Sequence, residues 1–304
     1  MVEQIEPAES VETASGAGHA PGSGSAQHRW GLRPRAWGNL LLVITSFPAL
    51  LFFLVPLLAL VLRISPSDLL ATVVDRQVAQ AIQVSLVTTA FTLALTLLGG
   101  TPVAFLLARR QFRGHALLDT LLDLPLVLPP AVAGIALLLT FGRFGLIASA
   151  TPVGLNLAFT QTAVVLAQTF VAAPFYMKTA ATAFAGVDRE LEQAAAVDGA
   201  GPLAVFRHIT VPVCAPALLG GAVMTWARAL GEFGATILFA GNFPGLTQTM
   251  PLAIYLGFEQ DLRVALTLSI ILLVVSFGIL FVVRVALRQR LAGATLDDAV
   301  RRRP

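Results

Sequence analysis

The sequence has few charged residues and little of the chemistry that enzymes use. Only 12% of its 304 residues are charged, whereas an average soluble domain has roughly 25%. The one cysteine, Cys214, excludes an intramolecular disulfide, and the four histidines lack the spacing of a metal site. No nucleophile–base pair is evident. We therefore expect neither an enzyme nor a cofactor or metal centre.

Long apolar runs take the place of the missing charge. Apolar residues make up 56% of the chain, and the mean hydropathy is +0.80. Charge-free runs long enough to cross hydrocarbon alternate with short charged segments, and one further run, 212–240, is interrupted only by Arg228 and Glu232. The sequence predicts an all-α integral membrane protein with about six transmembrane helices. Their expected positions are about 39–62, 79–108, 118–141, 160–184, 212–240 and 264–287.

The two ends of the chain differ from its centre. The N-terminal segment is rich in Gly, Ser, Ala and Glu and has almost no large apolar groups, so we expect residues 1–38 to be a disordered cytoplasmic tail. No clear cleavage site follows the first apolar run, so the first span should stay attached. Residues 39–288 form the predicted transmembrane domain, and 289–304 the cytoplasmic C-terminal tail.

The basic residues predict the orientation. With the N-terminus inside, most arginines and Lys178 fall at the cytoplasmic side, and the arginines outside are Arg63, Arg76, Arg143 and Arg263. This positive-inside bias predicts a multi-pass protein of the bacterial cytoplasmic membrane with both termini cytoplasmic. Because the arginines are scattered along span ends, the sequence pI of about 9.7 does not indicate nucleic-acid binding.

The longest expected cytoplasmic connection, 188–212, has the pattern of two helices joined by a hinge. Asp188 is suited to cap a helix over 189–198, Gly199 to end it in a left-handed conformation, and Pro202 to begin a second helix over 202–208. Leu203 and Phe206 would form an apolar knob beside Arg207 and His208. Two interpretations stay open: a helix lying on lipid headgroups, or a helix that docks into a cytoplasmic partner.

The residues of this connection resemble a known motif. Gln193-Ala194-Ala195, then Gly199, then Ile209-Thr210-Val211-Pro212, is similar at every spacing to the EAA loop of bacterial ABC-importer permeases. Two positions depart from the consensus: Gln193 replaces Glu, with Glu192 one place earlier, and Val211 replaces Leu. The form Leu-Glu-Gln-Ala-Ala resembles the molybdate and sulfate branch of that family.

Two further stretches resemble molybdate permeases: Ala227 to Thr236, and Leu126 to Pro130 with Gly134. The resemblance covers about 39–288 and implies the type I, MetI-like permease architecture. It also implies that the loop couples the chain to an ATPase. The residues to which this role is carried over are Glu192, Gln193, Ala194, Ala195, Gly199, Pro202, Phe206, Arg207, Ile209 and Pro212.

The implied partners are two ABC ATPase subunits, a second copy of the permease and an extracytoplasmic oxyanion-binding protein. The resemblance implies import of molybdate, with sulfate, thiosulfate or tungstate as the alternative substrates. An ion-coupled secondary transporter is the alternative from another class. Such transporters usually carry internal repeats and several intramembrane acids, whereas Glu232 is the one acid well inside a predicted span.

A second argument for a separate ATPase does not depend on the resemblance: the sequence has no phosphate-binding loop. The single lysine, Lys178, precedes Thr179, but Met177 stands where GxxxxGK[ST] requires glycine. If ATP supplies the energy, its hydrolysis must occur on another polypeptide. The permease then needs a docking surface, which 188–212 is long enough to provide.

Several residues within the spans are candidates for the pathway or for packing. Arg228 and Glu232 lie four apart and should face each other in the protein interior. This pair is interpreted either as a structural ion pair or as Arg228 lining the path of the anion, held by Glu232. Gly231 and Gly234 would permit close helix approach, within the chain or between two chains. Pro129 and Pro130 should kink the third span, as structural kinks or as part of a gate.

Overall fold

The computed structural model describes the backbone of residues 35–150 and 156–301 and the side chains of 42–150 and 156–285. All regular structure in these residues is helical, which confirms the predicted fold class. Most of the predicted N-terminal tail lies outside the described residues. The helices are α1 (Arg35–Arg63), α2 (Pro66–Val73), α3 (Arg76–Arg109), α4 (His115–Val127), α5 (Pro130–Phe141), α6 (Leu146–Ala150), α7 (Gln161–Ala185), α8 (Arg189–Val197), α9 (Pro202–Val205), the π-helical turn η1 (Phe206–Thr210), α10 (Val211–Leu230), α11 (Gly234–Phe239), α12 (Met250–Gln260) and α13 (Leu262–Arg301).

The chain divides into two compact units, residues 1–54 and 55–304. The described part of the first unit is the N-terminal part of α1, whose apolar side chains from Leu42 onward are exposed. All the contacts described below lie within the second unit.

Five stretches of the described residues are long and apolar enough to cross a membrane. They are Leu42–Arg63, Arg76–Arg109, Pro130–Ala150, Pro202–Leu230 and Leu262–Val285. The predicted span 160–184 corresponds to the 25-residue helix α7, which is not among the five. Its sequence includes Gln168, Lys178 and several threonines, and neighbouring helices bury much of its surface. A helix surrounded by protein needs fewer apolar residues than one surrounded by lipid.

The predicted span 118–141 is wrong as one continuous helix. α4 ends at Val127 and α5 begins at Pro130, with Leu128 and Pro129 in extended conformation between them. Proline cannot donate a backbone hydrogen bond, and it disfavours helical geometry in the residue before it. Two successive prolines therefore end one helix and begin another, rather than merely kinking one.

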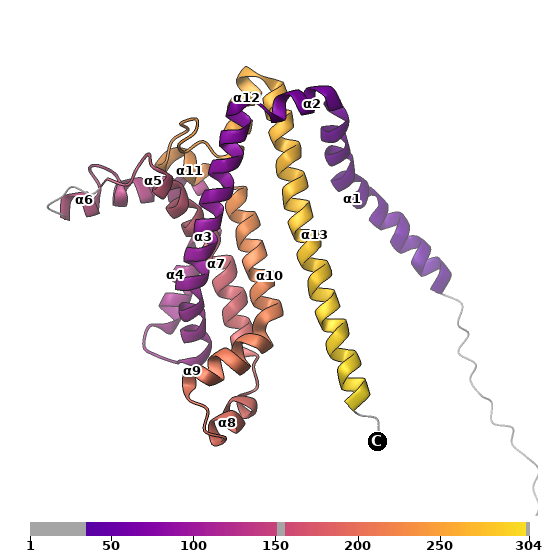
Figure 1. Cartoon of the computed structure of the whole chain (residues 1–304), viewed down its shortest axis with the longest axis vertical. Helices are drawn as coiled ribbons and strands as arrows, with labels where there is room; N and C mark the ends of the chain where they lie inside the picture. Colours follow the sequence, from indigo (N-terminus) through magenta and orange to yellow (C-terminus); the bar gives the residue numbers. More distant parts are fainter. Residues whose placement is uncertain (1–34, 151–155, 302–304) are drawn as a thin grey trace, which may run out of the picture. The chain divides into compact units, whose positions relative to one another are not determined.

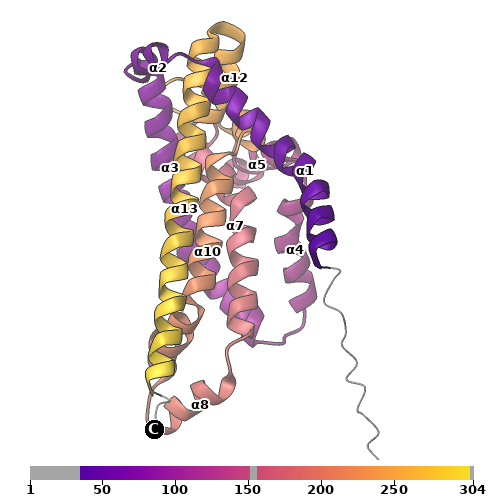
Figure 2. The ribbon, with the colours of Figure 1, turned by 90° about the vertical axis from the view of Figure 1, so that its right-hand side faces the viewer.

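The centre of the bundle is formed by α3, α7 and α10, which run side by side in both views (Figure 1, Figure 2). Small residues bring these helices close together. A Cβ added at Gly100 would lie 3.1 Å from the Met177 side chain, and one at Gly221 would lie 3.1 Å from that of Thr179. Such close backbone approach is typical of helix packing within membranes, where dispersion contacts take over from the hydrophobic effect.

Polar side chains on α3 and α7 pair across the same contact. The Thr92 hydroxyl donates to the Gln168 side-chain oxygen at 3.0 Å, and the Thr101 and Tyr176 hydroxyls lie 2.7 Å apart. Other buried hydroxyls, such as that of Thr89, donate to carbonyls one turn earlier in their own helix. These contacts satisfy polar groups that lipid could not.

Candidate functional site

The connection 188–212 has the local structure that its sequence predicts, up to its second helix. The Asp188 carboxylate accepts a hydrogen bond from the Glu190 N–H at 2.9 Å and so caps α8. Gly199 has φ +90°, the left-handed conformation expected at the end of that helix. Pro202 then begins α9 at its first position. Helix, hinge and helix are confirmed as local structure.

The second helix does not end at residue 208, as predicted, but continues into the bundle. Helical residues run without a break from Pro202 to Leu230 through η1 and α10. In η1 the Val211 N–H bonds to the Phe206 carbonyl five residues earlier, directly before Pro212. Because Pro212 donates no hydrogen bond and its ring crowds the carbonyl four residues earlier, the wider π turn accommodates it. A displacement of α9 would therefore be transmitted to α10 along one helix.

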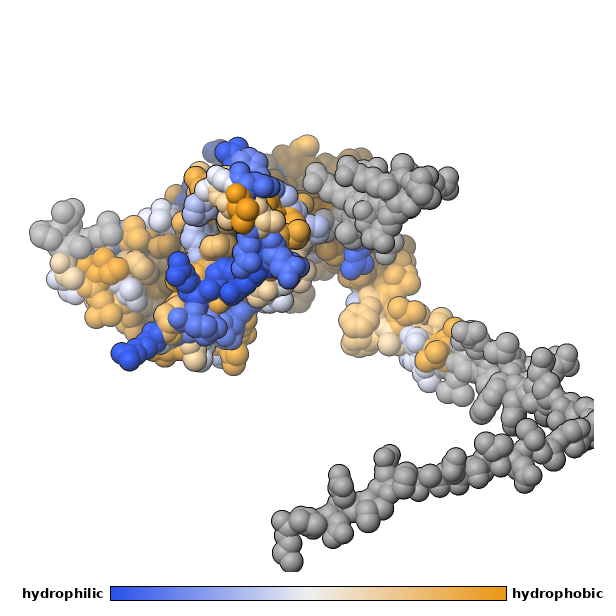
Figure 3. All heavy atoms as spheres, turned by 90° about the horizontal axis from the view of Figure 1, so that it is seen from below, coloured by the Kyte–Doolittle hydropathy of each residue, from blue (hydrophilic) through white to orange (hydrophobic). Residues whose placement is uncertain are grey.

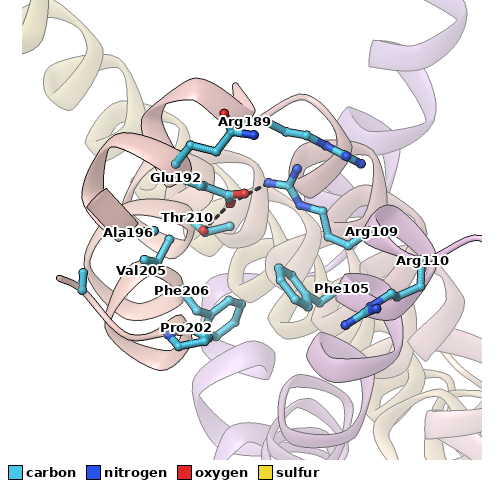
Figure 4. Close-up of a pocket in the computed structure, with 12 residues that line it drawn as sticks. Phe105, Arg109, Arg110, Arg189, Glu192, Ala196, Pro202, Val205, Phe206 and Thr210 are labelled. Carbon is cyan, nitrogen blue, oxygen red and sulfur yellow. Dashed lines mark hydrogen bonds and ion pairs between the residues drawn. The ribbon is translucent and has the colours of Figure 1, made fainter. Parts of the chain in front are cut away.

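A recess of about 450 Å³ opens where α8, α9 and η1 meet the C-terminal end of α3 (Figure 4). Figure 3 views the molecule from below Figure 1, where hydrophilic side chains gather at the centre of the face. We call the recess of Figure 4 the α8 recess. Its lining combines aromatic, cationic and acidic side chains from elements far apart in the sequence. They include Phe105, Arg109, Arg110, Arg189, Glu192, Gln193 and Phe206.

Glu192 joins three elements at this recess. Its Oε1 atom accepts from the Arg109 guanidinium at 2.6 Å and from the Thr210 hydroxyl at 2.6 Å (Figure 4). The Arg109 side chain is 10% exposed and that of Glu192 21%, so the pair is largely shielded from water. Because Arg109 ends α3 and Thr210 ends η1, this one carboxylate fastens α8 to α3 and to the helix that becomes α10.

Arg109, Thr210 and Phe105 were not predicted as site residues. From the sequence, Arg109 is one of the cytoplasmic arginines at the end of a span, and Thr210 is an unspecified position within the motif. Their signal is indirect: a charge-free run ends at Arg109, and the consensus acid of the EAA pattern is displaced by one place to Glu192. The Arg109–Glu192 contact joins residues 83 apart, beyond the reach of a local pattern.

The orientation expected for Phe206 is wrong. Its ring is partly buried and packs edge-on against Phe105, with centroids 5.0 Å apart, and lies 6.1 Å from the ring of Phe184. Leu203, the other predicted knob residue, is 78% exposed, and Val197 and Leu191 are the further large apolar side chains that this connection exposes, at 88% and 51%. Phe206 therefore anchors the connection to the bundle, and an outward apolar contact would fall to Leu203 and Val197.

The other predicted residues of the connection are distributed over its surface. Gln193 is exposed and lines the recess, Ala194 and Pro212 are exposed, and Ala195 and Ile209 are partly buried. Arg207 is exposed, away from the lining of the recess. Among the described residues, the recess arginines Arg110 and Arg189 have no ion-pair partner. The rim of the recess therefore carries uncompensated positive charge.

The second group of predicted residues lies where α10 ends. The Arg228 guanidinium contacts the Glu232 carboxylate at 2.7 Å, which confirms that the two side chains face each other. The predicted span 212–240 is wrong as one helix, because α10 ends at Leu230 and α11 begins at Gly234. Glu232 lies in this break, 1% exposed, and its other oxygen accepts from the Ala235 N–H at 2.9 Å. The same carboxylate thus pairs with Arg228 and caps α11.

Two stretches that resemble molybdate permeases pack directly on each other. A Cβ added at Gly234 would lie 2.7 Å from the Pro130 side chain, and one at Gly134 would lie 2.8 Å from the Ala235 carbonyl oxygen. Pro129 and Pro130 begin α5, so this crossing of α5 and α11 requires glycine on both sides. The close approach predicted for Gly234 is thereby found within one chain. Gly231 meets no second helix at such a distance.

A third ion-pair cluster was not predicted. The single lysine, Lys178 of α7, contacts Asp119 at 2.5 Å and Asp123 at 2.9 Å, both from α4. The two aspartates lie one turn apart on α4, so the ammonium bridges successive turns. This cluster is half exposed and fastens α4 to the central helix.

The described residues form a helical bundle with five stretches long and apolar enough to cross a membrane, and a surface loop is fastened to its central helices. The family model described as "Binding-protein-dependent transport system inner membrane component" matches residues 100–292. The chain belongs to that family. It is an ABC-importer permease, a transport component rather than an enzyme.

Individual proteins agree with this assignment. A probable transport system permease protein NifC of Clostridium pasteurianum is 35% identical over 270 residues, covering 87% of this chain and 93% of its own. The molybdenum transport system permease protein ModB of Mycobacterium tuberculosis is 40% identical over 234 residues, covering 77% and 89%. A bacterial ABC transporter that imports the polysaccharide alginate has the same fold, with a TM-score of 0.69 at 17% identity over 84% and 96% of the chains. The predicted type I permease architecture is confirmed.

Proposed function

We propose that this chain is the permease subunit of an ATP-driven importer that carries molybdate across the cytoplasmic membrane. Molybdate is proposed as the substrate because the chain is 40% identical, over 77% of its length, to a protein named as a molybdenum transport permease. Sulfate, thiosulfate and tungstate are the competing anions. Membership of a binding-protein-dependent family argues against an ion-coupled secondary transporter.

Coupling to a separate ATPase is the proposed role of 188–212. The α8 recess supports it because two arginines without an ion-pair partner, Arg110 and Arg189, line it, and the same loop exposes the apolar side chains of Val197 and Leu203. A loop that presents both charged and apolar side chains suits a protein partner better than lipid alone. The positive-inside bias supports placing this face in the cytoplasm, with both termini.

The proposed assembly has two copies of this permease, two ATPase subunits and an extracytoplasmic oxyanion-binding protein. ATP hydrolysis would move the partner surface, and the continuous helix from Pro202 to Leu230 would carry the movement to the region of Arg228. The Arg109–Glu192–Thr210 contacts support this view, since they tie the loop to two central helices at once.

Uptake of labelled molybdate tests the proposed substrate. Cells that lack this gene should lose molybdate uptake and keep sulfate uptake, and re-expression of the chain should restore the loss. Unlabelled tungstate and sulfate, added in excess as competitors, separate the remaining anions. If sulfate uptake fell while molybdate uptake continued, the proposed substrate would be wrong.

Arg228 is the proposed pathway residue, and its pairing dictates how it must be tested. Arg228→Gln alone would leave Glu232 buried and unpaired, at a cost of about 3–5 kcal/mol, so it confounds folding with transport. Arg228→Gln with Glu232→Gln removes both charges. In a wet pathway one positive charge attracts an anion by about 1–4 kcal/mol, and loss of the Glu232 charge offsets part of this, so uptake by the double variant should fall about fivefold.

The control for this prediction is Arg228→Lys, which keeps the charge and should retain most of the uptake. Assembly with the ATPase is measured by co-purification for every variant. Normal uptake by the doubly neutral variant would leave the pair with a structural role only.

A further inference from the structure

A second, smaller recess lies at the end of the bundle where α3 begins. It has a volume of about 180 Å³ and is lined by Gln80, Gln83, Val84 and Val87 of α3, Gln161 of α7 and Gly245 of the loop between α11 and α12. We call it the glutamine recess. Since one water molecule takes about 30 Å³ of liquid, the recess has room for several waters or for one tetrahedral oxyanion.

The three glutamine side chains have no partner for their amides. Among the described residues, none of Gln80, Gln83 and Gln161 makes a side-chain hydrogen bond. Each amide has two N–H donors, so three of them supply six donors around one small volume. Gln83 and Gln161 are exposed and Gln80 is partly buried, so these amides are open to water or to a small ligand.

The loop between α11 and α12 approaches one of these amides closely. Gly245 has φ +73°, and a Cβ added there would lie 3.2 Å from the amide atoms of Gln80. A side chain at position 245 would therefore crowd the Gln80 amide, and glycine leaves that space open. The recess is thus formed by three separate segments that meet at defined positions.

The lining contains no charged residue. An oxyanion bound by neutral N–H donors is held by hydrogen bonds without the strong attraction of a full opposite charge. Conduction requires binding that is favourable enough for entry and weak enough for release. Neutral amide donors therefore suit a place where an anion binds weakly before it moves on.

The recess lies at the same end of the bundle as Arg228. Leu230, two residues after Arg228, packs in one cluster with Val78 and Ala81 of α3, one turn or less before Gln80 and Gln83. We propose that the glutamine recess is an entry site for a tetrahedral oxyanion on its way to Arg228. This inference rests on the proposed import of molybdate and adds a binding site to it.

Cysteine protection tests the site without an uptake assay. Cys214 is buried and is the single cysteine, so a Cys214→Ala background leaves a thiol only where one is introduced. Val87→Cys places a thiol in the recess without removing a donor, and Val74→Cys, at a site 82% exposed just before α3, is the matched control. The purified permease–ATPase complex, in a phosphate-free detergent, is labelled with a hydrophilic maleimide in sodium molybdate or in sodium chloride of equal ionic strength.

Molybdate should slow labelling at Val87→Cys by about fivefold or more and leave Val74→Cys unchanged. Adding Gln83→Ala and Gln161→Ala should restore the rate in molybdate to that in chloride. Equal rates in both salts, or no labelling at Val87→Cys, would overturn the proposal. So would protection by the binding protein alone, which would indicate a protein contact. These outcomes concern the recess, whereas failure of the proposed function appears as normal molybdate uptake in cells without the gene.

Discussion

Replacing Gly199 with valine is expected to abolish coupling between ATP hydrolysis and transport while the protein still inserts into the membrane. Gly199 has φ +90°, a region that β-branched residues almost never occupy and that costs an ordinary residue about 1–2 kcal/mol. No atom lies within 4 Å of an added Cβ, so the effect comes from the backbone and not from a clash. The strain should unwind the end of α8 and misplace the surface proposed to meet the ATPase.

Gly201 offers a matched control two residues away. A Cβ added there also meets nothing within 4 Å, but its φ is −66°, which valine adopts freely. Gly201→Val should therefore retain coupling, and Gly199→Asn should be intermediate, because asparagine tolerates the left-handed region. The measurement is ATPase activity stimulated by loaded binding protein in proteoliposomes, with co-purification of the ATPase. Equal activities of Gly199→Val and Gly201→Val would contradict the backbone argument.

Removing the Glu192 carboxylate is expected to uncouple the loop from the central helices. In Glu192→Ala, Arg109 and the Thr210 hydroxyl both lose their acceptor, and the Arg109 Nε is already without a partner. The pair is shielded but not fully buried, so its loss should cost more than the roughly 0–1 kcal/mol of an exposed pair and less than the 3–5 kcal/mol of a buried one. Stimulated ATPase activity should fall severalfold even where the ATPase still binds.

A double-mutant cycle separates this contact from general damage. Arg109→Ala, Glu192→Ala and the double variant should be strongly non-additive, because the two side chains act through one contact. Arg113→Ala is the control, since Arg113 is exposed and has no ion-pair partner among the described residues. If the effects of Arg109→Ala and Glu192→Ala simply added, the proposed link from α8 to α3 would be refuted.

Helical class and the connection 188–212 were predictable because they depend on neighbours along the chain. Uncharged runs indicate spans, and Asp188, Gly199 and Pro202 each act through backbone geometry within a few residues. The predicted spans were wrong where the apolar pattern of the sequence is continuous but the helix is interrupted. Leu128–Pro129 and 231–233 interrupt apolar runs that hydropathy alone treats as single helices. The carboxylate of Glu232, by capping α11, helps to stabilise the second interruption.

The sequence by itself determined that the chain is an all-helical membrane protein, where its surface loop turns, and which family it resembles. Only the tertiary structure decided that Glu192 meets Arg109, that Phe206 turns inward, and that Gly134 and Gly234 lie in one crossing. The physical reason is the distance along the chain over which each effect acts. Hydropathy, capping and backbone preference act over a few residues, whereas these contacts join segments tens of residues apart, and how the helices pack decides which of them meet.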